Sequence, residues 1–141
     1  MKRSYMLGMG MLSRLFSCFF IFQVLHDTGS ALYFLKKHDI IYRDFKPENI
    51  LIRQKVDGTV EKAVLCDLGI SRTISTDIQS NLSCVGTDIW MAPEIKSIKE
   101  DSRRAEAFGK YGHPIDVFGF GLVAQWLLTG KLQTAKVVSG M

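Results

Sequence analysis

The chain has 141 residues, a length that fits one domain better than two. Hydrophobic residues make up 47% and charged residues 23%, so the composition is globular and excludes a disordered tail or a low-complexity chain. The net charge of +4 is mild and its basic residues are scattered, which argues against nucleic-acid binding. The three cysteines lack the spacing of a zinc site or a disulfide framework, and this favours a reducing compartment such as the cytoplasm.

Residues 1–19 form an apolar N-terminal segment to which the sequence assigns no element. Lys2 and Arg3 precede the apolar run, as in a signal peptide, but Ser13 and Arg14 interrupt it and no cleavage site of small residues follows. We find no unbroken run of about 20 apolar residues and therefore expect no membrane span. Helical spacing of apolar side chains favours a core helix instead, with these inward positions: Ile21, Val24, Leu25, Thr28, Ala31, Leu32 and Leu35.

The middle of the chain contains a hairpin pattern followed by a long polar stretch. Two β-prone runs, Ile50–Arg53 and Val60–Cys66, flank the dipeptide Asp57-Gly58, which is a strong turn signal. The stretch from Ser71 to Thr87 is rich in Ser and Thr and lacks periodicity, so it predicts a long loop.

The last third of the chain predicts two helices. The charged region Glu94–Gly112 suggests a short helix. Ile115–Leu128 is almost wholly apolar and too short to cross a bilayer, so it predicts a helix buried on all sides. Gly130 follows as its expected C-terminal stop.

The candidate chemistry lies in three polar clusters. The first follows an apolar run and places the carboxylate of Asp44, the ammonium of Lys46 and the amide of Asn49 within six residues. The second is Asp67, at the end of a β-prone run and before a turn glycine. A carboxylate beside an amide oxygen suits Mg²⁺, which prefers oxygen ligands. The third cluster is Gly86–Glu94, which closes the polar loop.

Taken in order, these clusters resemble the motifs of eukaryotic protein kinases. Tyr-Arg-Asp-Phe-Lys-Pro-Glu-Asn is similar to the catalytic loop H-R-D-L-K-P-x-N, and Asp-Leu-Gly is similar to D-F-G. Ala-Pro-Glu matches A-P-E, and Asp-Val-Phe-Gly-Phe-Gly is similar to D-x-W-S-x-G. The resemblance covers about Ile21–Gly130. It implies an α+β, protein-kinase-like fold in which residues 20–141 form a partial domain: a mostly helical large lobe with a small β-hairpin.

The resemblance also implies a role for each polar residue of the first two clusters. Asp44 matches the catalytic base that accepts the proton of the substrate hydroxyl, and Lys46 matches the residue that neutralises charge on the transferring phosphate of ATP. Asn49 and Asp67 match the two Mg²⁺ ligands.

Three further positions match residues that surround the nucleotide or support the loop. Leu51 corresponds to the floor under the adenine, and Cys66 lies beside the phosphate pocket. Asp116 resembles the buried carboxylate that holds the backbone of the catalytic loop. Ordinary core packing also accounts for Leu51 and Cys66.

The resemblance defines an activation segment, Asp67–Glu94. Arg43 matches the arginine that pairs with a phosphate on this segment. Thr87 matches a threonine that contacts the base and its lysine, and Glu94 matches an acid that pairs with a distant arginine. The candidate phosphate acceptors in this segment are Ser71, Thr73, Ser75, Thr76, Ser80 and Ser83.

The function implied is transfer of the ATP γ-phosphate to Ser or Thr of a protein substrate, because Lys46 and Thr87 follow the serine/threonine pattern. Tyr42 replaces the usual His and is similar to the Roco-type branch of the tyrosine-kinase-like group. The oligomeric state stays open.

No G-x-G-x-x-G loop and no V-A-I-K lysine precede the catalytic loop, so we expect the small lobe to be absent and the chain alone to be inactive. The alternatives are a non-catalytic, truncated kinase-like binding module and an incomplete gene model. The apolar helix Ile115–Leu128 lacks much of its expected cover, so we also predict exposed apolar surface and aggregation.

Overall fold

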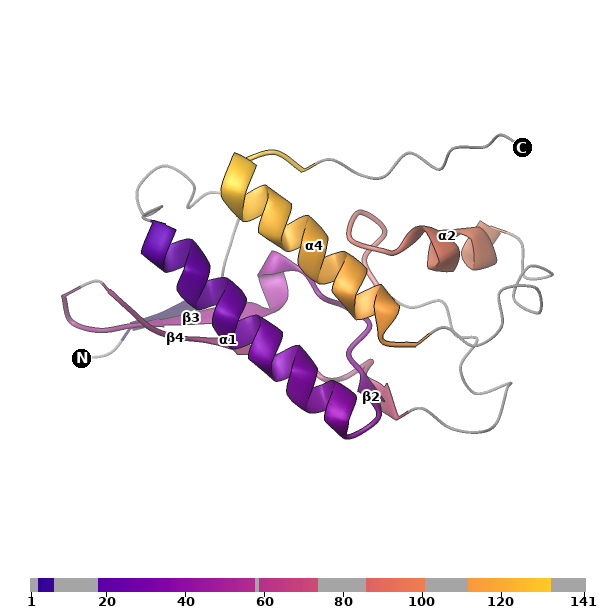
Figure 1. Ribbon diagram of the computed structural model, residues 1–141, viewed down its shortest axis with the longest axis horizontal. Helices are drawn as coiled ribbons and strands as arrows, with labels where there is room; N and C mark the ends of the chain where they lie inside the picture. The colour runs from indigo at the N-terminus through magenta and orange to yellow at the C-terminus, as the bar shows by residue number, and fades with distance from the viewer. Residues whose placement is uncertain (1–2, 7–17, 58, 74–85, 101–111, 133–141) are drawn as a thin grey trace.

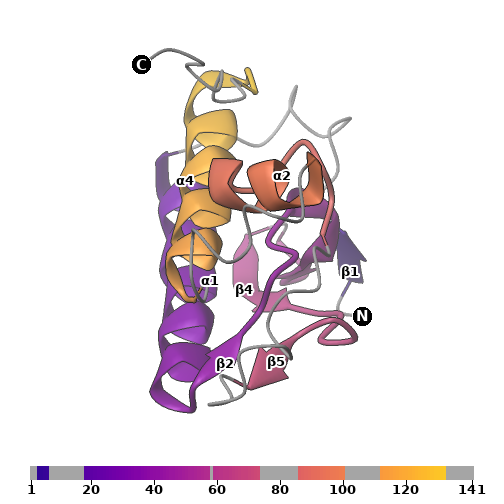
Figure 2. The same ribbon diagram turned by 90° about the vertical axis from the view of Figure 1, so that its right-hand side faces the viewer.

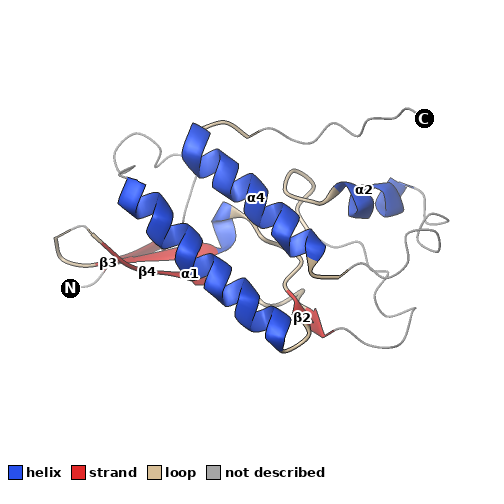
Figure 3. Ribbon diagram, viewed as in Figure 1, coloured by secondary structure: helices blue, strands red, loops and turns tan. Residues whose placement is uncertain are grey.

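The computed structural model describes residues 3–6, 18–57, 59–73, 86–100 and 112–132, and they form a mixed α+β arrangement (Figures 1 and 3). The helices are α1 (Cys18–Lys37), α2 (Pro93–Glu100) and α4 (Pro114–Thr129). Figure 2 shows α1 and α4 together on one side of the strands. The strands are β1 (Arg3–Met6), β2 (Ile40–Ile41), β3 (Ile50–Gln54), β4 (Val60–Leu65) and β5 (Arg72–Thr73).

The larger sheet has the strand order β1-β3-β4, with both pairs antiparallel. The predicted hairpin is confirmed as β3 and β4, in a register that places Ile52 opposite Ala63. In its loop, Asp57 accepts a hydrogen bond from the backbone N–H of Thr59 at 2.9 Å, an Asx turn that suits the Asp-Gly signal. β1 lies in the segment that the sequence left unassigned, and it pairs with the outer edge of β3.

The smaller sheet joins two segments that are far apart in the sequence. β2 pairs antiparallel with β5, with Ile40 opposite Thr73 and Ile41 opposite Arg72. β5 lies within the first residues of the stretch that was predicted to be a long loop. It brings the start of the catalytic loop beside the residues that follow Asp67.

Helix α1 confirms the predicted core helix, and its buried residues share one face. Val24 and Thr28 are buried completely or nearly so, and the hydroxyl of Thr28 donates to the carbonyl of Val24 at 2.7 Å, which satisfies it inside the core. Asp27 ties the helix to the sheet, because its carboxylate accepts a hydrogen bond from the backbone N–H of Ala63 at 2.9 Å. The sequence pattern did not indicate this link.

Among the described residues, α1 is the one helix that is long and apolar enough to cross a membrane by length and composition. This differs from the expectation drawn from the sequence. The observation is weak support for a span, since core helices of soluble proteins and signal sequences meet the same criterion. In this fold the inner face of α1 packs into the hydrophobic core.

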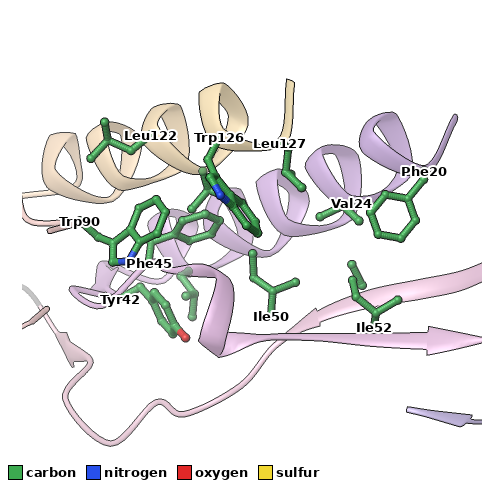
Figure 4. Close-up of a cluster of buried hydrophobic side chains, with 13 residues drawn as sticks. Phe20, Val24, Tyr42, Phe45, Ile50, Ile52, Trp90, Leu122, Trp126 and Leu127 are labelled. Atoms are coloured by element: carbon green, nitrogen blue, oxygen red, sulfur yellow. The ribbon is translucent and has the colours of Figure 1, made fainter. Parts of the chain in front are cut away.

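Helix α4 packs along α1 and over the catalytic loop (Figures 1 and 4). Trp126 lies edge-on to Trp90, with ring centroids 6.4 Å apart. Gly130 follows the last residue of the helix, as predicted, and caps it. Its φ of 67° is left-handed, and its backbone N–H donates a hydrogen bond to the carbonyl of Trp126. The prediction that this helix is buried on all sides is wrong, because Val117 and Leu128 are 66% and 67% exposed.

Candidate active site

A short polar loop between β2 and β3 forms the centre of the candidate site. Ile41, Tyr42 and Phe45 are buried and anchor the loop in the core, so the polar residues between and after them have little freedom. Pro47 opens a single 3₁₀ turn, Pro47–Asn49, which leads directly into β3.

Asp116 fixes the backbone of this loop from α4. Its two carboxylate oxygens accept hydrogen bonds from the backbone N–H groups of Tyr42 and Arg43, at 2.9 and 2.8 Å. Burial raises the pKa of Asp116, and the two backbone hydrogen bonds oppose that effect. Arg43 has a φ of 74°, a strained value for a residue with a side chain, and these bonds help to hold it. Asp116 therefore ties α4 to the loop backbone by two hydrogen bonds.

The carboxylate of Asp44 is surrounded by donors. The Nζ atom of Lys46 lies 2.6 Å from Oδ2, and the side-chain amide of Asn49 donates to the same oxygen at 3.0 Å. Oδ1 accepts from both the backbone N–H and the hydroxyl of Thr87, at 3.1 and 3.0 Å. Lys46 also donates to the Thr87 hydroxyl at 2.7 Å. The structure therefore brings together four of the residues that the sequence singled out.

Two opposing effects set the pKa of Asp44. Burial raises it, but the hydrogen bonds from Lys46, Thr87 and Asn49, together with the Lys46 charge, bring the pKa below its ordinary value. The carboxylate is therefore ionised at neutral pH, which is the form that accepts a proton or orients a hydroxyl.

Gly86 allows the Thr87 loop to approach the catalytic loop. Its φ is 122°, and a Cβ atom built there would lie 2.8 Å from the carbonyl oxygen of Arg43. Any other residue would force two backbones apart. Gly86 belongs to the third polar cluster of the sequence, where its motif did not indicate this role. The signal that could have indicated it is a glycine directly before a candidate site residue.

Asn49 and Asp67 lie on neighbouring segments. The backbone N–H of Cys66 donates to the carbonyl of Asn49 at 3.0 Å, which places Asp67 one residue beyond this contact. Asp67 is exposed, has a φ of 57° and accepts a hydrogen bond from the N–H of Gly69 at 3.1 Å. Carboxylate and amide oxygens are hard donors, so these residues fit a Mg²⁺ ion that keeps water or phosphate oxygens as its other ligands. The described residues hold no cluster of three His, Cys, Asp or Glu side chains that would form an all-protein site.

The buried tyrosine of the loop adds a further tie. The Tyr42 hydroxyl donates to the carbonyl of Cys66, and the Cys66 thiol contacts the carbonyl of Asn49 at 3.2 Å. Burial raises the pKa of the Tyr42 hydroxyl, and the neighbouring Cys66 and Asp44 add to that shift. Burial likewise raises the pKa of the Cys66 thiol, and the negative charge of Asp67 raises it further. Both groups therefore stay neutral and act as donors.

The two candidate nucleotide-contact residues belong to the two arms of the β3–β4 hairpin. Leu51, on β3, is partly buried, and Cys66 follows the end of β4. Met6 of β1 is the register partner of Leu51, and among the described strands β1 has β3 as its only partner. β1 therefore lies beside the expected adenine floor, a neighbour that the sequence did not reveal.

The structure places only part of the expected activation segment. The guanidinium Nε of Arg43 donates to the carbonyl of Ile70 at 2.6 Å, so this side chain already contacts the segment. The hydroxyl of Ser71 donates to the carbonyl of Tyr42 at 3.2 Å. Glu94 is half-buried in the first turn of α2. The other candidate acceptors lie outside the described residues, apart from Thr73 in β5: Ser75, Thr76, Ser80 and Ser83.

Residues 11–138 match the family model described as protein kinase domain. Similar curated proteins include a probable serine/threonine-protein kinase of Dictyostelium discoideum, 36% identical over 75% of this chain and 15% of that protein. The meiosis-specific serine/threonine-protein kinase mek1 of Schizosaccharomyces pombe is 33% identical over 91% of this chain and 28% of its own length. The chain thus spans less than a third of the length of these relatives.

A solved structure shows the same fold. The crystal structure of the yeast RNA Pol II CTD kinase CTDK-1 complex contains a chain that matches with a TM-score of 0.71 and 20% sequence identity. The match covers 94% of this chain and 40% of the other. Together with the observed mixture of helices and strands, it confirms the predicted α+β, kinase-like fold as a partial domain.

Proposed function

The chain belongs to the protein kinase family, and from that premise we propose that its parent activity is transfer of the γ-phosphate of ATP to Ser or Thr of a protein. The observation that carries this proposal is the network of Asp44, Lys46, Asn49 and Thr87, which converges on one carboxylate. Phosphoryl transfer depends mainly on positioning and charge stabilisation, and a network of this kind supplies both.

In the proposed reaction, Asp44 orients the substrate hydroxyl and accepts its proton as the oxygen attacks the γ-phosphorus. The bond between the γ-phosphorus and the β–γ bridging oxygen breaks, and ADP leaves with that oxygen. Lys46, 2.6 Å from Asp44, is placed to offset negative charge on the transferred group. Thr87 bonds to both residues and holds the carboxylate and the ammonium at a fixed separation. The lowered pKa of Asp44 keeps it in its accepting form at neutral pH.

Asn49 and Asp67 would hold Mg²⁺, and Leu51 and Cys66 would contact the nucleotide. When bound, the metal neutralises charge on the phosphate oxygens. The chain's own contribution is to fix the Asn49 amide, which donates to the Asp44 carbonyl at 2.9 Å, and to turn the Asp67 carboxylate outward on an exposed bend.

Serine and threonine are the proposed acceptors because similar curated proteins carry that specificity in their names and because Lys46 contacts Thr87. Membership of the tyrosine-kinase-like group, with a Roco-like loop, remains a proposal that depends on Tyr42. In support of it, the fold accommodates a tyrosine here by burying the ring and pairing its hydroxyl with Cys66.

The test is phosphate transfer from labelled ATP to a generic basic protein, compared with the Asp44→Asn variant. We propose that the 141-residue chain alone transfers phosphate poorly, because no glycine-rich loop or V-A-I-K lysine is found in its sequence. Robust turnover that Asp44→Asn abolishes would establish the activity and refute this inactivity. Turnover that survives Asp44→Asn would contradict the assigned base.

A second candidate function is a non-catalytic binding module. It is favoured by the exposed aromatic side chains on the outer face of α1, including Phe19, Phe22 and Tyr33, which are 60–65% exposed. Partner binding by a chain that shows no nucleotide affinity would support this candidate. Nucleotide affinity that Asp67→Asn weakens would support the kinase proposal instead.

A further inference from the structure

A small cavity lies where α4 meets the loop around Asp44. Its volume is about 20 Å³, and its lining includes Phe45 from the loop, Trp90 from the segment before α2, and Gly119 from α4. Figure 4 shows Phe45 and Trp90 next to α4, and both residues are buried. A cavity of at least about 10–15 Å³ can hold one water molecule, and this one is too small for a larger ligand.

Gly119 opens this space on the side of α4. A Cβ atom built at Gly119 would lie 3.2 Å from the carbonyl oxygen of Phe45 and 3.8 Å from the carbonyl oxygen of Trp90. Both oxygens therefore lie close to one point beside the helix. In the motif D-x-W-S-x-G, which this part of the chain resembles, a serine stands at the position of Gly119. The chain thus lacks a side chain, and a hydroxyl group, at this point.

The two carbonyl groups beside Gly119 need hydrogen-bond donors. No described residue donates a hydrogen bond to the carbonyl of Phe45 or to that of Trp90. Because both residues are buried, an unpaired carbonyl in either of them lowers the stability of the fold. Proteins commonly satisfy such groups with a buried water molecule, whose two O–H bonds match two acceptors.

The charges around the cavity favour a neutral ligand over a cation. Arg43 lines the cavity, and none of the described lining residues is acidic. A cation would therefore be repelled by the guanidinium without a carboxylate to compensate. In addition, two carbonyl oxygens are fewer ligands than Mg²⁺ or Ca²⁺ requires.

We propose that one water molecule binds in this cavity, named here the Gly119 water site, and donates hydrogen bonds to the carbonyl oxygens of Phe45 and Trp90. The site complements a contact one turn earlier on the same helix. There, Asp116 accepts hydrogen bonds from two backbone N–H groups of the loop around Asp44. The carboxylate thus pairs with donors of the loop, and the water pairs with one of its acceptors.

The water connects two segments that meet at the carboxylate of Asp44. Phe45 lies between Asp44 and Lys46, and the N–H of Trp90 donates to the carbonyl of Thr87 at 2.9 Å. A bridge between Phe45 and Trp90 therefore limits the movement of Lys46 relative to Thr87. This positioning role rests on the proposed function, whereas the water site itself does not depend on phosphate transfer.

The first measurement compares alanine and serine at two glycines of α4 by chemical denaturation. Gly119→Ala and Gly119→Ser place the same Cβ atom in the cavity and displace the water, but only serine brings a hydroxyl that can donate to a carbonyl. We therefore expect Gly119→Ser to have the higher denaturant midpoint. Gly121 is exposed and nothing lies within 4 Å of its Cβ position, so there helix propensity alone should make Gly121→Ala more stable than Gly121→Ser.

The second measurement detects the water in the 141-residue chain. Magnetic relaxation dispersion of ¹⁷O counts long-lived bound waters, and Gly119→Ser should lose about one of them while Gly121→Ser keeps them all. Amide hydrogen exchange of Thr87, whose N–H donates to Asp44 at 3.1 Å, should be several-fold faster in Gly119→Ala and largely restored in Gly119→Ser. Circular dichroism checks each fold. Cross-relaxation between water and the Hα protons of Gly119 tests the native chain without any substitution.

Several outcomes would overturn the proposal. The same order of midpoints at Gly119 as at Gly121 would show that the two carbonyls do not need a donor. An unchanged water count in a folded Gly119→Ser variant, or no cross-relaxation at Gly119 in the native chain, would exclude a water in this cavity. A native midpoint that rises in potassium chloride but not in choline chloride would assign the cavity to a cation. Failure of the proposed function is seen separately, because turnover that survives Asp44→Asn contradicts the assigned base without changing the water count.

Discussion

The loop around Asp44 and the outer face of α1 differ in their surroundings: the side chains of the first have protein partners, and those of the second face solvent. Both carboxylate oxygens of Asp44 have protein partners, and the loop backbone is held by Asp116. On the outer face of α1, Phe19, Phe22 and Tyr33 project into solvent. Positioned chemistry needs the first kind of environment, whereas an unpartnered apolar surface indicates association. The contrast separates the region to which we assign the proposed chemistry from the surface to which we assign the proposed binding.

The largest predicted effect comes from removing the carboxylate that holds the loop around Asp44. Asp116→Ala removes both acceptors and leaves two backbone N–H groups, of Tyr42 and Arg43, without their partners in a largely buried place. We expect a loss of about 3 kcal/mol in the free energy of unfolding, measured by chemical denaturation. Glu100→Ala, at an exposed helix end, is the control. Equal stability of the two variants would show that Asp116 does not hold the loop.

The next prediction tests the close approach of the Thr87 loop. Gly86→Ala places a Cβ atom 2.8 Å from the Arg43 carbonyl oxygen, at a φ of 122°. We expect a destabilisation of about 2 kcal/mol, with the Thr87 contacts to Asp44 weakened. Gly121→Ala in α4 is the matched control, because nothing lies within 4 Å of its Cβ position and alanine favours a helix. A smaller effect at Gly86 than at Gly121 would contradict the argument.

The sequence predicted this ordered region better than the rest, and the reason is locality. Asp44, Lys46 and Asn49 lie within six residues, so their motif and their geometry are both local. The hairpin followed from Asp57 and the alternating strands around it for the same reason. Their proposed roles still depend on the family resemblance, because a short polar loop of this kind has no unique chemistry.

Features that depend on distant partners were not predicted. The pairing of Ile40 with Thr73 joins two strands of two residues each, too short to carry a periodic signal. Asp27 looks like an exposed helical charge in the sequence, yet it caps an N–H of β4. Exposed apolar surface was predicted for α4, but its apolar composition alone does not show which face the rest of the fold leaves uncovered.

A third prediction concerns pH. The pKa of Asp44 is lower in the fold than the ordinary value of about 4, because its hydrogen bonds outweigh burial. Its contribution to stability is therefore complete above pH 4 and is lost as the pH falls through the lower, folded-state pKa. We expect Asp44→Asn to be less stable than the native chain by about 2 kcal/mol at pH 7, and this gap to narrow below pH 4.

The measurement is the denaturant midpoint of the native chain and of Asp44→Asn from pH 7 to below pH 4. Glu100→Gln is the control, and its difference in stability from the native chain should not change with pH. A gap that widens on acidification would mean that burial dominates and that Asp44 is destabilised by its charge. Asp116 acts in the opposite direction, because its raised pKa makes the fold lose stability as the pH rises from about 4 through the folded value. Repeating the comparison in an Asp116→Asn background isolates the Asp44 contribution.

The smallest predicted effect concerns an exposed ion pair near the site, and it tests whether burial is what makes an ion pair stabilising here. Lys99 on α2 contacts Asp88 at 2.6 Å, next to Thr87, but both side chains are exposed, at 49% and 71%. Water screens such a pair, so Lys99→Ala should leave the denaturant midpoint unchanged within experimental scatter, at low and at high salt. The corresponding pair of Lys46 and Asp44 is similarly short but has side chains only 20% and 11% exposed, and Lys46→Ala should lower the midpoint clearly. An equal shift in both variants would show that burial does not distinguish the catalytic loop from its surroundings.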